Sequence, residues 1–163
     1  MSSRSYRSDA RVESARETRR RILAAAEREL LEAGYHGTSI ATLAAAAGVS
    51  PQTIYNAVGA KAQVLKAVYD VLLAGDDEPI PMRDRAKFRA VLSQRSLPAT
   101  MRAYARVGRL IIDRVGKLIG AVLADGAGAD DELRAFLAAI DSERRSGAGH
   151  DVPITIVAHD PAV

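Results

Sequence analysis

Residues 38–61, TSIATLAAAAGVSPQTIYNAVGAK, contain two short helical stretches joined by a Gly-Val-Ser segment at positions 48–50. In the first stretch, apolar residues recur at helical spacing until Gly48, and a hydroxyl residue precedes them. This pattern predicts a helix over residues 39–47, with Thr38 as its N-cap and a turn that begins at Gly48.

The second stretch begins with Ser50 and Pro51, a capping hydroxyl followed by proline at the first helical position. It predicts a helix over residues 51–57 that is mostly polar and only about two turns long. Because so short a helix is unstable alone in water, we expect neighbouring helices to hold it through Ile54 and Val58.

Two longer amphipathic helices flank this pair. One is predicted from about residue 13 to Gly34, and the other from about residue 60 to Gly75, since a glycine follows the helical pattern in each case. The apolar positions that we expect on their buried sides are Ile22, Ala25, Ala26, Leu30, Val64, Leu65, Val68 and Leu72.

Two helices joined by a tight turn that contains glycine are typical of a helix-turn-helix, whose second helix enters the major groove of DNA. Gln52, Thr53 and Asn56 are then expected to project outward, where amide and hydroxyl groups can bond base edges. The hydroxyl of Tyr55 and the ammonium group of Lys61 are suited to phosphate oxygens.

The starts of the two short helices, at Thr38 and Ser50, also offer backbone N–H groups to phosphates. From the residues alone, however, the pair can equally be a packing unit without a DNA partner, because the segment is not especially basic.

The distribution of charge bears on this question. The net charge is +3, and the first 21 residues hold seven arginines against three acidic residues. We interpret residues 1–12 as a disordered basic arm, which suits a polyanion such as DNA or is simply a solvated tail.

The second half of the chain is predicted to be helical as well. The acidic, proline-containing segment 75–81 marks a boundary, so we divide the chain into a helix-turn-helix domain over residues 13–75 and a second helical domain over residues 76–146. Helices are expected at about 83–92, 98–123 and 130–146. The fold class is therefore all-α.

The stretch TRRRILAAAERELLEAGYHGTSIATLAAAAGVSPQTIYNAVGAKAQVL, residues 18–65, resembles the DNA-binding domain of the TetR family of bacterial transcriptional regulators. The resemblance is in register without a gap. It includes Ile22, Ala25, Ala26, Gly34, Tyr35, Thr38, Ala44, Ala47, Gly48, Val49, Ser50, Thr53, Tyr55, Lys61 and Leu65.

The resemblance implies roles for individual positions. Thr38, Ser50, Tyr55 and Lys61 match positions that typically lie at the phosphate backbone. The positions that match residues in or beside the major groove are Pro51, Gln52, Thr53 and Asn56.

Three positions depart from the common pattern of that family. Gln52 stands where glycine is frequent and adds a possible base contact, whereas Ala57 stands where histidine or tyrosine is frequent and lacks a backbone contact. Val58 stands where phenylalanine is frequent and keeps an apolar role with less volume. The sequence preference of relatives therefore does not transfer to this chain.

The resemblance further implies that the second domain binds a small-molecule effector and forms a homodimer on a palindromic operator. The side chains expected to line an effector pocket are Met82, Phe88, Leu92, Met101, Tyr104, Ile111 and Phe136.

From Gly147 the helical pattern stops, and residues 147–163 are expected to form an irregular tail. Family members usually continue with two helices that pair across the dimer. We therefore favour the hypothesis that the second domain is incomplete through truncation or an altered reading frame, the alternative being a genuinely short relative.

Other classes of function have little support in the sequence. The three histidines do not show metal-ligand spacing, and neither a phosphate-binding glycine loop nor a nucleophile–base pair is visible, so we expect no enzyme, metal or cofactor. We expect a cytoplasmic, ligand-responsive repressor, or alternatively a helical interaction module that has lost DNA binding together with its dimerisation helices.

Overall fold

The computed structural model describes residues 3–125 and 130–157. In that part of the chain it has seven α-helices and one short 3-10 helix, so the all-helical fold class is confirmed. The elements are α1 (Ser3–Gly37), α2 (Ile40–Ala47), α3 (Pro51–Ala57), α4 (Lys61–Ala74), η1 (Met82–Asp84), α5 (Ala86–Leu92), α6 (Leu97–Ala124) and α7 (Asp131–Val157).

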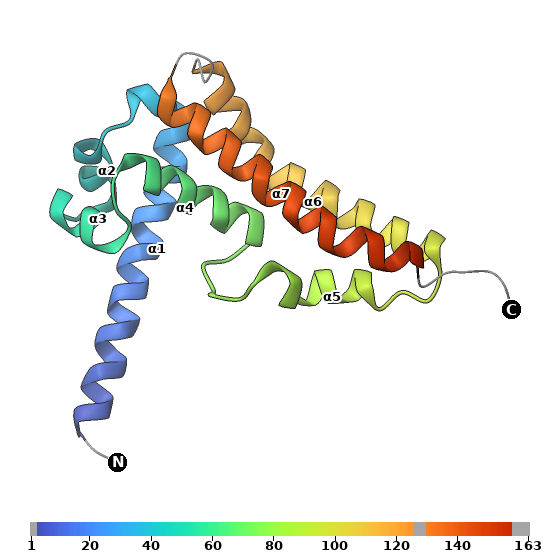
Figure 1. Ribbon diagram of the computed structural model, residues 1–163. Coiled ribbons are helices and arrows are strands. Elements are labelled where there is room, and N and C mark those ends of the chain that lie inside the picture. Colours follow the sequence, from blue (N-terminus) through green and yellow to red (C-terminus); the bar gives the residue numbers. More distant parts are fainter. Residues whose placement is uncertain (1–2, 126–129, 158–163) are drawn as a thin grey trace, which may run out of the picture.

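The helices form two groups that meet at α4 (Figure 1). The long helix α1 runs beside α2, α3 and α4, and its first turns extend away from them. The helices α6 and α7 lie side by side and run in opposite directions, and α5 packs against α6. The first group carries the predicted helix-turn-helix, and the second group supports it from one end.

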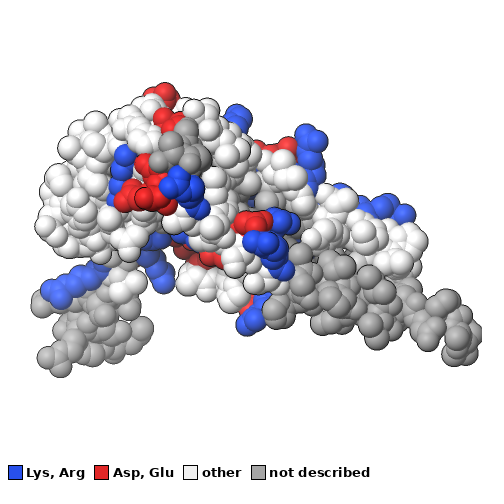
Figure 2. Space-filling view, turned by 45° about the horizontal axis from the view of Figure 1, so that its top comes forward, with Lys and Arg blue, Asp and Glu red and all other residues white. Residues whose placement is uncertain are grey.

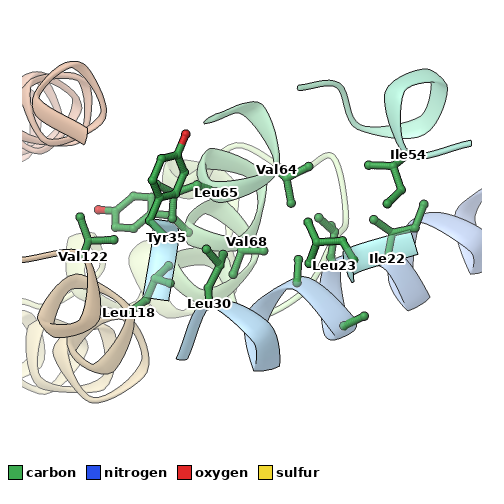
Figure 3. Packing of buried hydrophobic residues seen from close by; sticks show 14 of the residues in the cluster. Ile22, Leu23, Leu30, Tyr35, Ile54, Val64, Leu65, Val68, Leu118 and Val122 are labelled. Carbon is green, nitrogen blue, oxygen red and sulfur yellow. The ribbon is translucent and has the colours of Figure 1, made fainter. Parts of the chain in front are cut away.

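One hydrophobic core joins the two groups. Ile22 of α1 and Leu65 of α4 are buried in the same cluster as Leu118 of α6 and Leu133 of α7. The close view in Figure 3 has Val64 and Val68 of α4 between Ile22 and Leu23 of α1 on one side and Leu118 and Val122 of α6 on the other. The boundary predicted at residues 75–81 is an exposed segment of chain, but apolar packing continues across it from one group to the other.

The predicted helices of the helix-turn-helix and the helix that follows it are confirmed. The helices α2, α3 and α4 begin and end within one residue of the predicted positions, and Gly34 breaks α1 with a φ of 72°. One cap differs, because Ser39 and not Thr38 caps α2: the Ser39 hydroxyl accepts from the Thr42 N–H at 3.1 Å.

Two predictions of irregular structure were wrong where the structure describes the chain. Residues 3–12 continue α1, and residues 147–157 continue α7. Between Ser3 and Ala33 the sequence has neither glycine nor proline, so one helix extends by adding a hydrogen bond for each residue fixed. That reason does not apply to α7, which continues past Gly147 although residues 147–157 contain two glycines and a proline. The rest of the predicted tail, residues 158–163, lies outside the described residues.

Candidate nucleic-acid interface

The turn between α2 and α3 sets the direction of α3. Gly48 has φ 64° and ψ 41°, a left-handed conformation that only glycine adopts without strain, and its N–H donates to carbonyls at the end of α2. Val49 then donates to the Ala44 carbonyl at 3.0 Å. Ser50 is extended, and its hydroxyl accepts from the Thr53 N–H at 3.1 Å, so it caps α3 as predicted.

The helix α3 has one buried face and one exposed face. Ile54 is 0% exposed and is the one residue of α3 that is fully buried. It points toward Ile22 of α1 in the close view of the core (Figure 3). Gln52, Tyr55 and Asn56 are exposed, with 49% of Tyr55 open to solvent. A helix this short is therefore held by its apolar side and presents its polar side outward.

The exposed amides of α3 form a small network. Gln52 Nε2 donates to Asn56 Oδ1 at 2.9 Å, which leaves the Gln52 carbonyl oxygen and the Asn56 amide N–H groups available to a partner. The Thr53 hydroxyl lies 2.8 Å from the Ser50 hydroxyl, so it takes part in the cap. Two neighbouring amides with free donors and acceptors can bond the base edges of a major groove.

The residues predicted to meet phosphates lie in different environments. Ser50, the N-cap of α3, is exposed. Pro51 and Tyr55, which belong to α3, are exposed as well. Lys61 is half-buried, with its ammonium nitrogen 4.1 Å from the centre of the Tyr35 ring. Thr38 differs from the expectation, because it is 2% exposed and its hydroxyl donates to the Gly34 carbonyl at 2.7 Å. Its side chain braces the break in α1 instead of facing solvent.

Two arginines of α1 lie at the two ends of α3, and the sequence analysis did not single them out. Arg19 Nη1 donates to the Ala57 carbonyl at 3.0 Å, and Arg21 Nη2 lies 3.5 Å from the Gly48 carbonyl. The run Arg19-Arg20-Arg21 gave only a general basic signal. Figure 2 shows basic side chains where α1 leaves the largely uncharged lobe that α2 and α3 form. The cations of this surface come from α1 and not from α3.

A polar contact ties the segment before α2 to the junction between α6 and α7. His36 Nδ1 is 2.9 Å from an Asp125 oxygen, and its Nε2 is 2.9 Å from an Asp130 oxygen. Hydrogen bonds to Asp130 and then to Asp125 raise the pKa of His36. The neighbouring Tyr35 hydroxyl donates to Glu132 at the start of α7, and its burial, followed by that hydrogen bond, raises the pKa of Tyr35.

The residues predicted to line an effector pocket do not come together. Leu92, Met101 and Tyr104 are exposed, whereas Phe136 is buried in the core with its ring edge-on to Tyr69. Met82, Phe88 and Ile111 are half-buried. Of this set, only Met82 lines any of the three hollows that lie around α1, α4 and residues 76–85.

Across residues 3–125 and 130–157, acidic, histidine and cysteine side chains do not gather in a group that can hold a metal ion. The helices described there include none that is both long enough and apolar enough to cross a membrane.

The helix α3 is short and capped, has an exposed polar face and follows α2 through a glycine turn. This arrangement is that of a helix-turn-helix of the DNA-binding kind. Residues 22–68 match the model of the bacterial regulatory proteins of the tetR family. Residues 22–68 thus form a TetR-family helix-turn-helix DNA-binding domain, which supports a role for the protein as a DNA-binding transcriptional regulator. In the same comparisons, no curated protein and no solved structure matches the chain.

Proposed function

We propose that the protein is a ligand-responsive repressor that binds a palindromic operator as a homodimer in the bacterial cytoplasm, where it meets the chromosome. The observation that carries this proposal is the division of α3 into a buried side at Ile54 and an exposed polar side at Gln52, Tyr55 and Asn56. Every surface helix has a polar side, but this one carries two amides and a phenol without a charge, which are groups that bond base edges and phosphates.

On this proposal, α3 lies in the major groove with Pro51, Gln52, Thr53 and Asn56 in or beside it. Gln52 and Asn56 give up the hydrogen bond between them and form hydrogen bonds to base edges instead. Ser50, Tyr55 and Lys61 meet phosphates, and Arg21 adds a cation beside the turn. Thr38 is buried and both its N–H and its hydroxyl donate to carbonyls of α1, so it contributes by positioning the start of α2.

Dimerisation is supported by an exposed apolar stripe on α6. Met101, Ile112 and Leu123 are 55%, 64% and 57% exposed, and their spacing of 11 residues turns the helix by only about 20° between neighbours. A second copy of the chain, packed on this stripe, places two α3 helices on two half-sites. Ile112→Glu is expected to convert a dimer into a monomer in sedimentation experiments and to weaken binding to a two-half-site operator.

The decisive experiment is a footprint over the DNA that flanks the protein's own gene. A repressor protects two half-sites about one helical turn apart, and its affinity falls steeply as the salt concentration rises. Protection that is absent at low salt, with a chain that is folded by circular dichroism, refutes the proposal. The chain is then a helical interaction module that has lost DNA binding.

Two substitutions separate the predicted roles in α3. Tyr55→Phe removes a phosphate contact, so affinity falls alike on every operator variant, whereas Gln52→Ala costs about 1–3 kcal/mol at one or two base positions. Tyr104→Phe, at an exposed tyrosine on α6, is the matched control and leaves affinity unchanged. If Tyr55→Phe and Gln52→Ala behave like Tyr104→Phe, α3 is not the recognition helix.

A further inference from the structure

A hollow of about 500 Å³ lies where the end of α4 meets α5 and α6, and its lining is strongly basic. Its charged residues are Arg85, Lys87, Arg89, Arg114, Asp76 and Asp84. We call it the basic hollow. Its volume lies within the range of about 300–1,000 Å³ that is usual for small-molecule sites.

The carboxylates of the basic hollow do not neutralise its cations. Arg85 is 8% exposed and donates from Nη1 to both Asp76 oxygens, at 2.8 and 2.7 Å. Asp84 lies 3.9 Å from Arg83, on the outer side. Among the described residues, Lys87, Arg89 and Arg114 do not form an ion pair with a carboxylate, so the hollow, whose lining has four cations and two carboxylates, carries an excess of positive charge.

Arg114 is the residue that most needs an anion. Its Nη1 atom is buried and has no hydrogen-bond partner among the described residues. The guanidinium group lies on Gly75, where even a single Cβ would collide with it. A buried cationic N–H without an acceptor is costly, which is the state expected of a group that a ligand completes.

Capping of α4 does not account for these charges. The Lys87 ammonium group donates to the Ala74 carbonyl at 2.6 Å, so one cation already serves the end of that helix. Desolvation, followed by the nearby Arg114 and Arg85 cations, lowers the pKa of Lys87. The cations at the end of α4 repel one another, so there is more positive charge here than the carbonyl groups of the helix end need.

We propose that the basic hollow binds a small molecule with a doubly charged oxyanion group, a phosphate monoester or a dicarboxylate, and that this molecule is the effector of the regulator. The proposal rests on the proposed function for its regulatory meaning and on the geometry of Arg85, Lys87, Arg89 and Arg114 for its chemistry. The oxyanion accepts from the Arg114 guanidinium group, whose buried Nη1 turns away from Gly75 to reach it, and competes with Asp76 for Arg85.

A short chain of contacts leads from the basic hollow to α3. The residue after Asp76 is Asp77, whose carboxylate accepts from Arg19 Nε at 3.1 Å. Arg19 in turn donates from Nη1 to the Ala57 carbonyl at the end of α3. An anion that takes Arg85 from Asp76 shifts segment 76–78, and with it the arginine that holds α3. By linkage, DNA must weaken anion binding by the same factor by which the anion weakens DNA binding.

The test measures anion binding to the whole chain without DNA. Inorganic phosphate and succinate, each titrated by calorimetry at constant ionic strength, stand for the two sources of the oxyanion. We expect saturable binding of one to one stoichiometry for at least one probe, and about 10- to 100-fold weaker binding in Arg114→Gln. Arg102→Gln, at an exposed position on the same helix, is the matched control and leaves binding unchanged.

A second variant guards against misfolding of Arg114→Gln. Arg89 is exposed, so Arg89→Gln keeps the fold, and it is expected to weaken phosphate or succinate binding about tenfold. Absence of binding for both probes, or equal loss in Arg102→Gln and Arg89→Gln, overturns the proposal.

DNA affinity with and without the bound probe completes the test. A footprint that fails while an anion still binds the hollow refutes the proposed function alone. A footprint that stands while neither probe binds refutes the basic hollow alone.

Discussion

Replacement of Ile54 tests how the recognition helix is held. Ile54 is 0% exposed and is the sole fully buried residue of α3, a helix of seven residues that has no stability of its own. Ile54→Ala leaves a cavity beside Ile22, and we expect a loss of about 2–5 kcal/mol in the free energy of unfolding. For a chain of this size, that loss corresponds to a fall of roughly 4–20 °C in melting temperature.

A graded series makes the prediction sharper. Ile54→Val removes one carbon from the buried site and is expected to cost about 0.5–1.5 kcal/mol. Val12→Ala removes two carbons from a residue that is 49% exposed, so it should stay within about 0.5 kcal/mol of the wild type. Burial, and not the number of carbons removed, sets this order.

The assay is urea denaturation followed by circular dichroism, with operator affinity measured by fluorescence anisotropy on the same samples. Because α3 loses its one apolar anchor, Ile54→Ala should reduce affinity even at temperatures where the rest of the chain stays folded. If Ile54→Ala costs no more than Val12→Ala, α3 is not held by Ile54 and the reasoning is wrong.

Five further substitutions, at three positions, probe the turn and the contact at His36. Ser50→Ala removes the cap of α3 and should cost about 0.5–2 kcal/mol of stability, measured by urea denaturation. Ser50→Asp keeps the cap but should weaken DNA binding, measured by anisotropy, because its negative charge repels phosphate. Gly48→Ala should cost about 1–2 kcal/mol for its left-handed backbone, and Gly48→Asn less, although the space around Gly48 is open. The stability that protonated His36 adds is complete below its unfolded pKa of about 6.5 and is lost as pH rises through its raised folded pKa, so a plot of melting temperature against pH should fall there in the wild type and stay flatter in His36→Gln.

The local signals of the sequence predicted the local structure well. The Ser50-Pro51 pair and the glycines at 34, 48 and 75 act within a few residues of chain, so the limits of α2, α3 and α4 follow from them directly. Where two residues offer the same chemistry, the choice was wrong by one position. Thr38 and Ser39 both carry a capping hydroxyl, and the structure buries Thr38 and uses Ser39.

The first residues were misread for a different physical reason. A run rich in arginine and serine has the composition of a disordered arm, but in the structure it continues a helix whose next turns contain ion pairs. The Arg20 guanidinium group is 2.8 Å from Glu13 and 2.9 Å from Glu17. Composition does not distinguish a solvated helix with ion pairs from an unfolded segment, because both expose the same charged groups.

Helical periodicity did not predict the basic hollow on the second half of the chain. Apolar residues at helical spacing predicted a pocket, but the same spacing sends Phe136 into the core and Met101 to the surface. The hollow that forms beside α4 is lined by charged residues instead, and its most telling contact joins Arg114 to Gly75 across 39 positions of sequence. That contact depends on how α6 crosses the end of α4. The sequence alone contains the residues of such a site but does not show that they lie together. The experiments on Arg114 therefore test a property that the motif of the DNA-binding domain does not predict, which is whether this hollow binds an oxyanion.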